Sequence, residues 1–347
     1  MRLLFVGGTG VISSECAALA SSRGHDLTLV TRGSSAALPP PPAVRVLTAD
    51  AHDPDGLRAV LTHDASGVRY DAVVQFVGYE PGHAADDVVT FAPRASQYIF
   101  ISTAAAYYPA DRLTVMREDS PQANAHWEYA RKKIEFEREL RMYAEAADLP
   151  ITIVRPAHTY GPTKIPAYVG NSAHPWTLID RMRRGADVIV PGDGTSLWTL
   201  THARDVAVGI VGLCGNEAAY GEAVNATSDI ALTWESIYST IAEEAGVPAK
   251  RFSEQVLHVP TDALVAADPR VEGGTRGDKM RCLLVNNAKM HALVPEWGPS
   301  ISLGEGMRES IAWFEAEPSR QVVDKAANDY LDRIAVIYRA ALAKAAG

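Results

Sequence analysis

The sequence predicts an α/β fold: a doubly wound parallel sheet with helices on both faces, joined to a smaller, interleaved substrate-binding domain in the C-terminal half. Two observations predict it. Apolar runs of strand length alternate with helical patterns through the first half of the chain, and a glycine-rich loop, GGTGVIS, joins the first run to the first helical pattern. Such alternation is typical of repeated βαβ units, whose crossover helices cover a parallel sheet.

The elements of the first half are expected in a regular order. Strands are predicted at residues 2–7, 26–32, 72–78, 98–102 and 151–156, and helices at about 13–23, from about Pro54 and around Tyr129. The run LPPPPA at 38–43 cannot form a helix or a central strand, because proline lacks the N–H group that both require. It is expected to form a loop beyond the second strand.

The second half of the chain is less regular. Prolines and glycines are frequent from residue 165 to Gly194, after which HARDVAVGIVGLC predicts a helix and EAVNAT predicts a short strand. We expect a dinucleotide-binding domain over 1–165 with a return segment at about 203–230, and a mainly substrate-binding domain over 166–347. From about Pro318, apolar residues at helical spacing predict one or two helices that pack against the rest.

Composition and charge exclude several classes of protein. Apolar residues make up 47% of the 347 positions and charged residues 22%, as in soluble globular proteins. The net charge of −9 opposes binding to phosphate backbones and anionic lipid, so neither nucleic acid nor a membrane is an expected partner. Three well-separated cysteines, and no His/Asp/Glu cluster at metal-ligand spacing, predict neither disulfides nor a metal site. The N-terminus MRLLFVGG is too short an apolar run for a signal peptide, so a cytoplasmic location is expected.

The loop GGTGVIS has the residues of a dinucleotide-binding turn. Gly7 permits the tight turn, Gly10 lets the backbone approach a pyrophosphate, and the following helix N-terminus offers unpaired N–H groups and the positive end of its dipole. Ser13 stands where a third glycine is usual, and it is small enough for close packing of helix and strand. The alternative is a tight turn that binds no ligand.

Two polar residues after the next strands bear on the choice of cofactor. Arg32 ends the second strand, where an NAD site carries an acidic residue for the ribose 2′-hydroxyl. An arginine forms charge-assisted bonds to a 2′-phosphate instead, which favours NADP over NAD. The alternative is a solvated arginine, with NAD bound through other contacts. Asp50, in the stretch LTADAHD at 47–53 after a further short strand, is expected either to accept a bond from the adenine amino group or to cap the helix that follows.

The stretch HWEYARKK places Tyr129 and Lys133 four positions apart. On a helix, residues at this spacing share a face, with Cβ atoms about 5–6 Å apart. A free phenol with a pKa of about 10 is a poor base at neutral pH, and lowering that pKa to about 7 requires roughly 4 kcal/mol of preferential phenolate stabilisation. A neighbouring ammonium and an oxidised nicotinamide ring contribute to such stabilisation. The alternative is an exposed polar pair.

Four motifs in order carry a family resemblance: GGTGVIS, a strand ending in Ser102 and Thr103, YARKK, and RPAHTYGP, which is similar to a family pattern RPxxxYGP. Over about residues 1–235 the chain resembles the extended short-chain dehydrogenase/reductase family of epimerases, dehydratases and reductases. The resemblance implies that Tyr129 is the general acid/base, that Lys133 binds the nicotinamide ribose, and that Thr103 hydrogen-bonds the reacting oxygen, with Ser102 next to the substrate. The residues expected to bind the cofactor are Gly7, Thr9, Gly10, Val11, Ile12, Arg32, Asp50, Phe76, Val77, Lys133 and Pro156.

The chain departs from the family pattern where substrates are recognised. Ala104 and Ala105 follow Thr103 where a 4,6-dehydratase carries an Asp-Glu pair, and alanine cannot protonate a leaving hydroxyl. Trp198 replaces the arginine that binds the substrate diphosphate, and Arg276 is out of register with the later one. We therefore expect a nucleoside, a monophosphate or an unactivated sugar derivative as substrate. Trp198 is expected to stack on a base or sugar, or else to be a buried packing residue.

Two further departures concern the dimer and the cavity wall. Only 24 positions separate Gly78 from Ser102, which leaves little room for the long helix of the usual family dimer, and no asparagine there matches the family's tetrad. Either a monomer or a homodimer is expected. His158 replaces a frequent asparagine and is expected to contact the substrate or to fill the wall.

These observations leave three functional hypotheses open. The first is an NAD(P)-dependent oxidoreductase acting on a secondary hydroxyl of a sugar, nucleoside or sugar nucleotide, most simply a redox-neutral epimerase. The second is an NADPH-dependent ketone reductase, which Arg32 favours because NADPH is the usual soluble hydride donor. The third is a catalytically silent scaffold or nucleic-acid-binding relative. In the first two, the expected partner is a small molecule.

Overall fold

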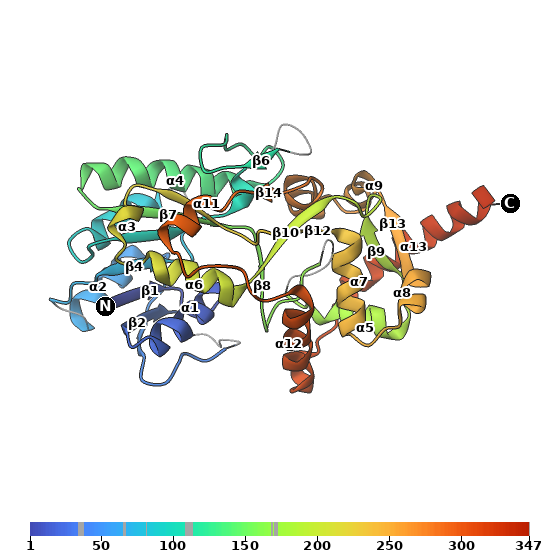
Figure 1. Ribbon diagram of the computed structural model, residues 1–347, viewed down its shortest axis with the longest axis horizontal. Coiled ribbons are helices and arrows are strands. Elements are labelled where there is room, and N and C mark those ends of the chain that lie inside the picture. The colour runs from blue at the N-terminus through green and yellow to red at the C-terminus, as the bar shows by residue number, and fades with distance from the viewer. Residues whose placement is uncertain are drawn as a thin grey trace.

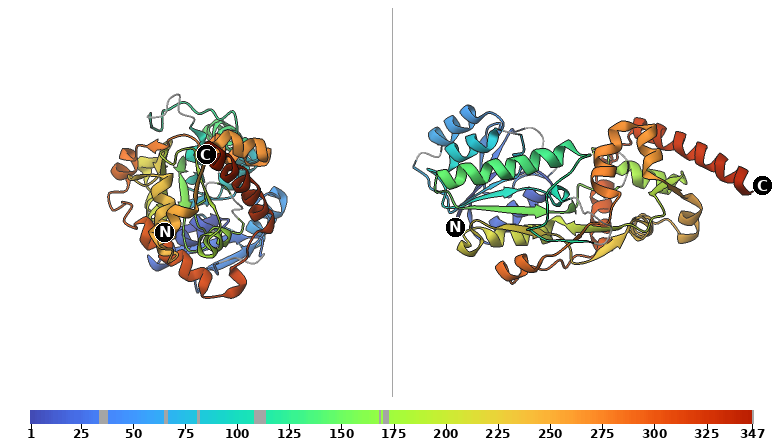
Figure 2. Two further views of the ribbon diagram at one scale, coloured as in Figure 1. Left: turned by 90° about the vertical axis from the view of Figure 1, so that its right-hand side faces the viewer. Right: turned by 90° about the horizontal axis from the view of Figure 1, so that it is seen from above.

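The computed structural model (Figure 1) describes residues 1–33, 38–64, 67–80, 82–107, 114–167, 169 and 173–346. The N-terminal half forms a sheet covered by helices, and a second group of strands and helices lies beside it along the long axis of the molecule. The C-terminal helix projects beyond this second group, at the end of the molecule that is far from the N-terminus (Figure 2).

The central sheet is the doubly wound parallel sheet that the sequence predicts. In the described part of the chain it has seven parallel strands in the order β11-β7-β5-β4-β1-β2-β3. Their bounds are β1 (Arg2–Val6), β2 (Asp26–Thr31), β3 (Arg45–Thr48), β4 (Ala72–Gln75), β5 (Tyr98–Ile101), β7 (Ile151–Pro156) and β11 (Ala223–Ala226). The strand order reverses between β1 and β4, and ligands of such sheets bind outside the carboxyl ends at this point.

Helices cover both faces of the sheet, which explains why its strands are continuous apolar runs rather than alternating ones. One face holds α1 (Val11–Ser22), α6 (Ala203–Leu213) and α11 (Ala288–Leu293), and the other holds α2 (Pro54–Asp64), α3 (His83–Phe91) and α4 (Glu128–Ala146). The short α3, of 9 residues, occupies the short segment noted in the sequence. The return of α11 to the sheet, where Met290 is fully buried, is not predicted by the sequence analysis.

The second group has its own hydrophobic core and small sheets. Its pairings are β8 (His158–Tyr160) and β12 (Ala231–Thr233) with β10 (Leu197–His202), β9 (Val188–Pro191) with β13 (Val256–Val259), and β6 (Val115–Met116) with β14 (Leu284–Val285). Its helices are α5 (Trp176–Arg184), α7 (Trp234–Glu244), α8 (Ala249–Gln255), α9 (Thr261–Ala267), α10 (Glu272–Gly274), α12 (Leu303–Glu315) and α13 (Lys325–Ala346). Short helical turns are η1 (Ala104–Ala106), η2 (Glu217–Ala219), η3 (Pro269–Val271), η4 (Thr275–Lys279) and η5 (Pro318–Arg320).

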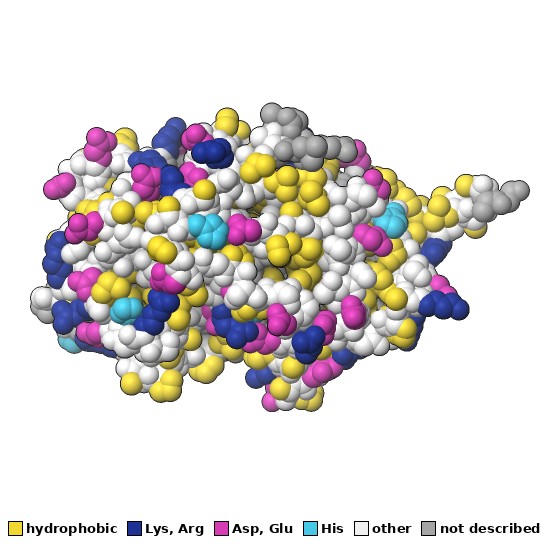
Figure 3. Space-filling view, in the orientation of Figure 1, with side chains coloured by type: hydrophobic (Ala, Val, Ile, Leu, Met, Phe, Trp, Pro, Cys, Tyr) yellow, Lys and Arg dark blue, Asp and Glu magenta, His cyan; other side chains and the backbone are white. Residues whose placement is uncertain are grey.

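The last helix, α13, packs along only part of its length. Tyr330 and Ile334 are buried, whereas Ile337 is 65% and Leu342 is 54% exposed. The expectation that the whole apolar pattern packs against the protein is therefore wrong for the second half of α13, which extends away from the molecule (Figures 2 and 3). Among the described helices, none combines the length and the apolar character needed to cross a membrane.

Candidate active site

A groove of about 420 Å³, here called the glycine-loop groove, lies at the carboxyl ends of the central strands and the start of α1. The structure brings together almost all the residues that the sequence analysis assigns to a cofactor. The groove is lined by Gly7, Thr9, Gly10, Val11, Ile12, Arg32, Asp50, Phe76 and Val77, and the two remaining residues, Lys133 and Pro156, line the adjoining cavity. Residues that follow β1, β2, β3 and β4 thus form one elongated site with Lys133 and Pro156.

The backbone of the glycine loop requires its first glycine. Gly7 has φ +90°, and a Cβ there would lie 2.5 Å from a methyl carbon of Val77. Gly10 caps α1, and its N–H donates to the Ser13 hydroxyl at 2.8 Å. The serine in the third glycine position therefore closes the first helical turn, and it is only 2% exposed. This close approach of strand, loop and helix fits a bound dinucleotide, whose pyrophosphate meets the helix N-terminus.

Arg32 and Asp50 lie on the wall of the groove. Asp50 accepts hydrogen bonds from the His52 backbone N–H at 3.0 Å and faces the His52 ring at 3.2 Å. The bond from the His52 backbone, followed by the ring and by Arg32, lowers the pKa of Asp50. The alternative role of Asp50 as a helix cap is wrong, because Asp53 accepts the Gly56 N–H at 3.1 Å at the start of α2. Asp50 is left as an ionised acceptor on the groove wall.

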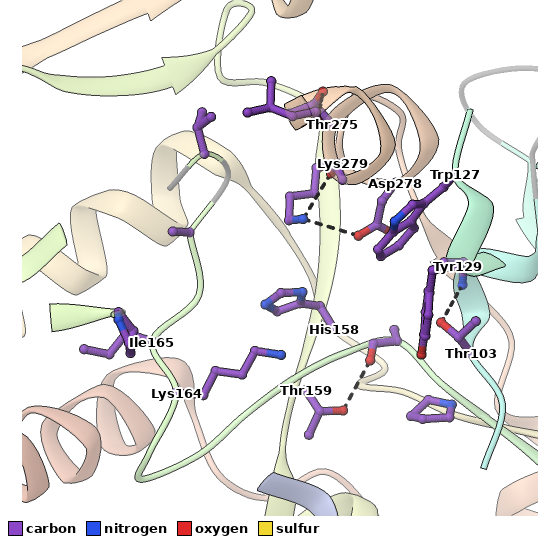
Figure 4. Close-up of a pocket in the computed structure, with 18 of the residues that line it drawn as sticks. Thr103, Trp127, Tyr129, His158, Thr159, Lys164, Ile165, Thr275, Asp278 and Lys279 are labelled. Atoms are coloured by element: carbon purple, nitrogen blue, oxygen red, sulfur yellow. Dashed lines mark hydrogen bonds and ion pairs between the residues drawn. The ribbon is translucent and has the colours of Figure 1, made fainter. Parts of the chain in front are cut away.

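A second cavity of about 600 Å³, here called the tyrosine cavity, adjoins the groove (Figure 4). Both spaces are lined by Ile12, Phe76, Ile101, Thr159 and Lys164, so they are continuous. Thr103 at the end of β5, Tyr129 in the first turn of α4 and His158 in β8 line the cavity, and Lys133 reaches it one turn beyond Tyr129. The candidate catalytic residues of the sequence analysis therefore share one space with the glycine loop.

Lys133 is held firmly in this cavity. Its ammonium donates to the carbonyls of Gly78 at 2.9 Å and Ile101 at 2.7 Å, and its side chain is only 3% exposed. Burial lowers the pKa of Lys133 to about 7. The alternative of an exposed polar pair is wrong, since Lys133 Nζ lies 5.9 Å from the centroid of the Tyr129 ring in the interior. Two of its three donors are used by the backbone, which leaves one for a ligand hydroxyl.

Tyr129 is packed between aromatic rings. Its ring centroid lies 4.9 Å from that of Trp127 and 5.8 Å from that of Tyr79. Burial raises the pKa of Tyr129 to about 12, and the negative charge of Asp278 adds to this effect. The chain by itself therefore stabilises the neutral phenol and not the phenolate expected from the sequence. The ammonium of Lys133 is directed to backbone carbonyls and does not offset the burial.

Thr103 and Ser102 have different surroundings. The Thr103 hydroxyl oxygen accepts the Ala105 N–H at 3.1 Å, which leaves its own O–H to donate into the cavity. Ser102 is 3% exposed, and its hydroxyl donates to the carboxylate of Glu137. That carboxylate is also paired with Arg155, at 2.6 Å. Ser102 lines the tyrosine cavity as expected, but its hydroxyl is used by a buried network, so a contact of this hydroxyl with substrate stays a prediction.

Trp198 does not lie where the sequence analysis expects it. Its side chain is 1% exposed in the core of the second group and stacks on Trp234, with ring centroids 5.9 Å apart. It is absent from the described lining of the tyrosine cavity. The alternative of a buried packing residue is therefore correct. Arg276 pairs with Asp262 at 2.7 Å and Glu272 at 3.0 Å, away from that lining.

Several residues of the cavity escaped the sequence analysis. Lys164 follows the YGP motif by two positions, and Asp278 and Lys279 come from a distant segment of which the sequence analysis considers only Arg276. Asn124 joins that segment to the catalytic elements, since its amide donates to Ala105 O at 2.9 Å and Gly277 O at 2.6 Å. No set of three or more His, Cys, Asp or Glu side chains in the described ranges is placed to hold a metal.

The fold, the glycine-loop groove and the Thr103, Tyr129 and Lys133 set define a dinucleotide-binding α/β protein of the extended short-chain dehydrogenase/reductase type. The chain belongs to the NAD-dependent epimerase/dehydratase family, whose sequence profile matches residues 3–226. Among curated proteins, it is 25% identical over 259 residues to the chloroplast stem-loop binding protein of 41 kDa b from Arabidopsis thaliana, which covers 71% of this chain. It is 25% identical over 197 residues, or 57% of this chain, to a UDP-glucose 4-epimerase from Mycolicibacterium smegmatis. The matches span 64% and 55% of those relatives.

Solved structures share the whole fold. An epimerase from Methanothermobacter thermautotrophicus superposes with a TM-score of 0.75 at 18% identity, covering 92% of this chain and 94% of that one. The UDP-glucose 4-epimerase of Thermotoga maritima gives a TM-score of 0.70 at 18% identity, covering 91% of this chain and 99% of that one. At these identities the likeness concerns the fold alone.

Proposed function

We propose that this protein is an NAD(P)-dependent oxidoreductase that acts on a secondary hydroxyl of a sugar, nucleoside or sugar nucleotide, as a redox-neutral epimerase. The observation that carries the proposal is the convergence of Thr103, Tyr129 and Lys133 on a cavity continuous with the glycine-loop groove. The family membership of the chain supports it. The name of the curated relative from M. smegmatis, UDP-glucose 4-epimerase, favours the epimerase over other reactions of the family.

In this proposal each side chain has a separate task. The chemistry that a bound nicotinamide supplies is reversible hydride transfer at the substrate carbon. During oxidation Tyr129 would take the proton of the reacting hydroxyl as a phenolate, a form that the positive ring of an oxidised nicotinamide would favour, and during reduction it would return the proton. Thr103 donates its O–H to the same oxygen, and Lys133 uses its remaining donor on the ribose. The pKa of about 12 makes Tyr129 a proton donor in the ligand-free chain, which suits the reduction half of the reaction.

Retention of the cofactor separates an epimerase from the alternative, an NADPH-dependent ketone reductase. An epimerase regenerates its cofactor in each cycle and does not need to release it, whereas a reductase exchanges it every turnover. We expect near-stoichiometric NAD or NADP in the purified, denatured protein, measured by mass spectrometry. An empty protein that binds and releases NADPH freely would support the reductase, and the substrates to test would then be carbonyl compounds.

Arg32 is proposed to favour NADP by binding the 2′-phosphate. Because charge-assisted bonds contribute about 1.5–3 kcal/mol, Arg32→Ala is expected to weaken NADP binding about tenfold or more. NAD binding should change less than twofold, and calorimetry with both nucleotides measures the difference. Arg117→Ala is a matched control, since Arg117 is exposed and does not line the groove. Equal losses for both nucleotides in Arg32→Ala would show that Arg32 does not recognise the phosphate.

A non-enzymatic alternative rests on the plant relative that is named a stem-loop binding protein. The net charge of −9 disfavours it, and basic side chains lie among acidic ones on the face shown in Figure 3. Binding of RNA hairpins at low salt tests it directly. Tight, salt-sensitive binding that survives Tyr129→Phe would favour this alternative over the proposed enzyme.

A further inference from the structure

One wall of the tyrosine cavity carries an excess of positive charge that the proposed reaction does not use. Lys164, Lys279, Asp278 and His158 line the cavity, with Lys164 across from Tyr129 and Asp278 beside Trp127 (Figure 4). They come from the turn after β8, from η4 and from β8 itself. These elements belong to different parts of the chain, and their polar side chains converge on one region of the cavity.

Of these four side chains, that of Lys164 is the charged one without a partner among the described residues. Among the described residues its ammonium has neither an ion pair nor a hydrogen bond, while its backbone closes a turn through Lys164 N–H to Gly161 O at 2.9 Å. Burial lowers the pKa of Lys164 to about 8, with a smaller contribution from Lys279. An unpaired ammonium in a desolvated cavity is costly, and it is usually retained where a ligand supplies the missing anion.

The neighbouring groups leave this positive charge uncompensated. Lys279 donates to Gly274 O at 3.0 Å and lies 3.5 Å from the only carboxylate of the cluster, Asp278. Lys279 is therefore paired with the one carboxylate of the cluster, and Lys164 is not. His158 stays neutral, since burial and the two lysines keep its pKa well below its usual range, so it neither adds to nor offsets the positive charge; its Nε2 atom is buried without a hydrogen-bond partner. With both lysines protonated and Asp278 ionised, these four residues carry a formal charge of one positive unit, and His158 Nε2 is a hydrogen-bonding nitrogen without a partner.

We infer that the tyrosine cavity recognises its substrate through a carboxylate held by Lys164 and Lys279, with His158 Nε2 as a further hydrogen-bonding partner. The inference rests on the proposed function, because it takes the content of this cavity to be the substrate. A carboxylate neutralises the single excess charge, whereas a phosphate monoester carries about −1.5 to −2. Trp198 is buried and Arg276 is paired with Asp262, so neither of these two residues offers a free positive charge to a substrate diphosphate.

The wall is fixed before any ligand binds. The turn that carries Lys164 is held from α12, where the Ser310 hydroxyl donates to Gly161 O at 2.8 Å. The η4 turn that carries Lys279 is held by Asn124, and a Cβ at Gly277 would lie 2.7 Å from Cβ of Trp127. Positioning both ammonium groups in advance reduces the entropy lost on binding.

Calorimetry with matched pairs of sugars tests the inference. The probes are D-glucuronate against D-glucose and D-galacturonate against D-galactose, each titrated into the full chain with saturating NAD at low ionic strength. At least one acid is expected to bind about tenfold or more tightly than its neutral partner, as for a charge-assisted contact. Lys164→Met and Lys279→Met should each remove most of that preference, while Lys132→Gln, which alters a half-buried lysine that is paired with Glu80 and Glu128 and does not line the cavity, should leave it unchanged.

Three outcomes would overturn the inference. The first is equal binding of acid and neutral sugar, or no binding of either acid. The second is tighter binding of D-glucose 6-phosphate than of D-glucuronate, which would identify a phosphate site. The third is a loss of NAD affinity in Lys164→Met with the acid preference intact, since Lys164 also lines the glycine-loop groove. Calorimetry measures binding without turnover, so its result is independent of whether the proposed reaction is correct.

The melting temperature of the Lys164→Met variant provides a second test of whether Lys164 lacks a partner. Because the ammonium of the half-buried Lys164 has no ion pair or hydrogen bond among the described residues, its removal should raise the melting temperature below pH 8. The pKa of Lys164 in the folded protein, about 8, lies below its ordinary value of 10.5. The charged lysine therefore lowers the free energy of unfolding fully below pH 8, and this loss of stability disappears as the pH rises toward 10.5. A lower melting temperature in Lys164→Met at pH 7 would show that Lys164 has a stabilising partner, and would contradict the inference.

Discussion

Turnover should fall by about a thousandfold in Tyr129→Phe, while the affinity for nicotinamide nucleotide changes less than twofold. General acid/base catalysis by a positioned side chain contributes about 10²–10⁴ to the rate, and phenylalanine cannot transfer a proton. The ring itself remains, so its packing against Trp127 and Tyr79 is retained. Folding and cofactor binding should therefore survive the loss of the hydroxyl.

The measurement needs a rate and a binding constant from the same protein. The rate is that of isomer interconversion, or of NADPH oxidation, for the first active compound found among sugars, sugar acids and sugar nucleotides. Tyr143→Phe is a matched control, because Tyr143 lies on the same helix with 38% exposure and does not line the cavity. Normal turnover in Tyr129→Phe would remove the proposed mechanism, and a parallel loss in Tyr143→Phe would indicate general damage to α4.

The parts of the site that the sequence predicts are those that depend on local signals. A glycine at φ +90°, the first helical turn after it and a pair at i and i+4 are each set by residues close in sequence. The parallel sheet then places the ends of β1, β2 and β4 at one edge whatever the details of packing. For this reason the glycine-loop groove contains the expected residues, from Gly7 to Val77.

The errors arise where long-range contacts decide the direction of a side chain. Ser102 ends a strand as expected, but its hydroxyl donates to Glu137 from α4, and no pattern near Ser102 indicates that partner. Trp198 lies in β10, whose side chains are buried on both faces. Its position in the segment that resembles the family pattern therefore does not reveal that its ring packs on Trp234. Lys279 reaches the cavity through a contact between Asn124 and Gly277, which are 153 positions apart.

Loss of the arginine in the buried network under the active site should cause the largest fall in stability. Arg155 and Glu137 are each 3% exposed and are joined by two bonds, of 3.0 and 2.6 Å. Arg155→Met leaves the Glu137 carboxylate buried with only Ser102 and Gln122 as donors. Breaking a buried pair in this way costs about 3–5 kcal/mol, which should appear as a lower melting temperature and urea midpoint.

A double-mutant cycle separates the free energy that the Arg155–Glu137 pair contributes to stability from the cost of leaving the Glu137 carboxylate buried without Arg155. In Arg155→Met/Glu137→Met the buried carboxylate is absent, so about half or more of the loss should be recovered, since apolar replacements of buried pairs are often tolerated. Arg138→Met is the surface control, because its pair with Glu135 on the same helix is exposed and should contribute less than about 1 kcal/mol. Additive losses would instead mean that Glu137 stabilises the fold mainly through Ser102 and Gln122. In that case Ser102→Ala should reproduce part of the loss, and the end of β5 that carries Thr103 would be held through Ser102.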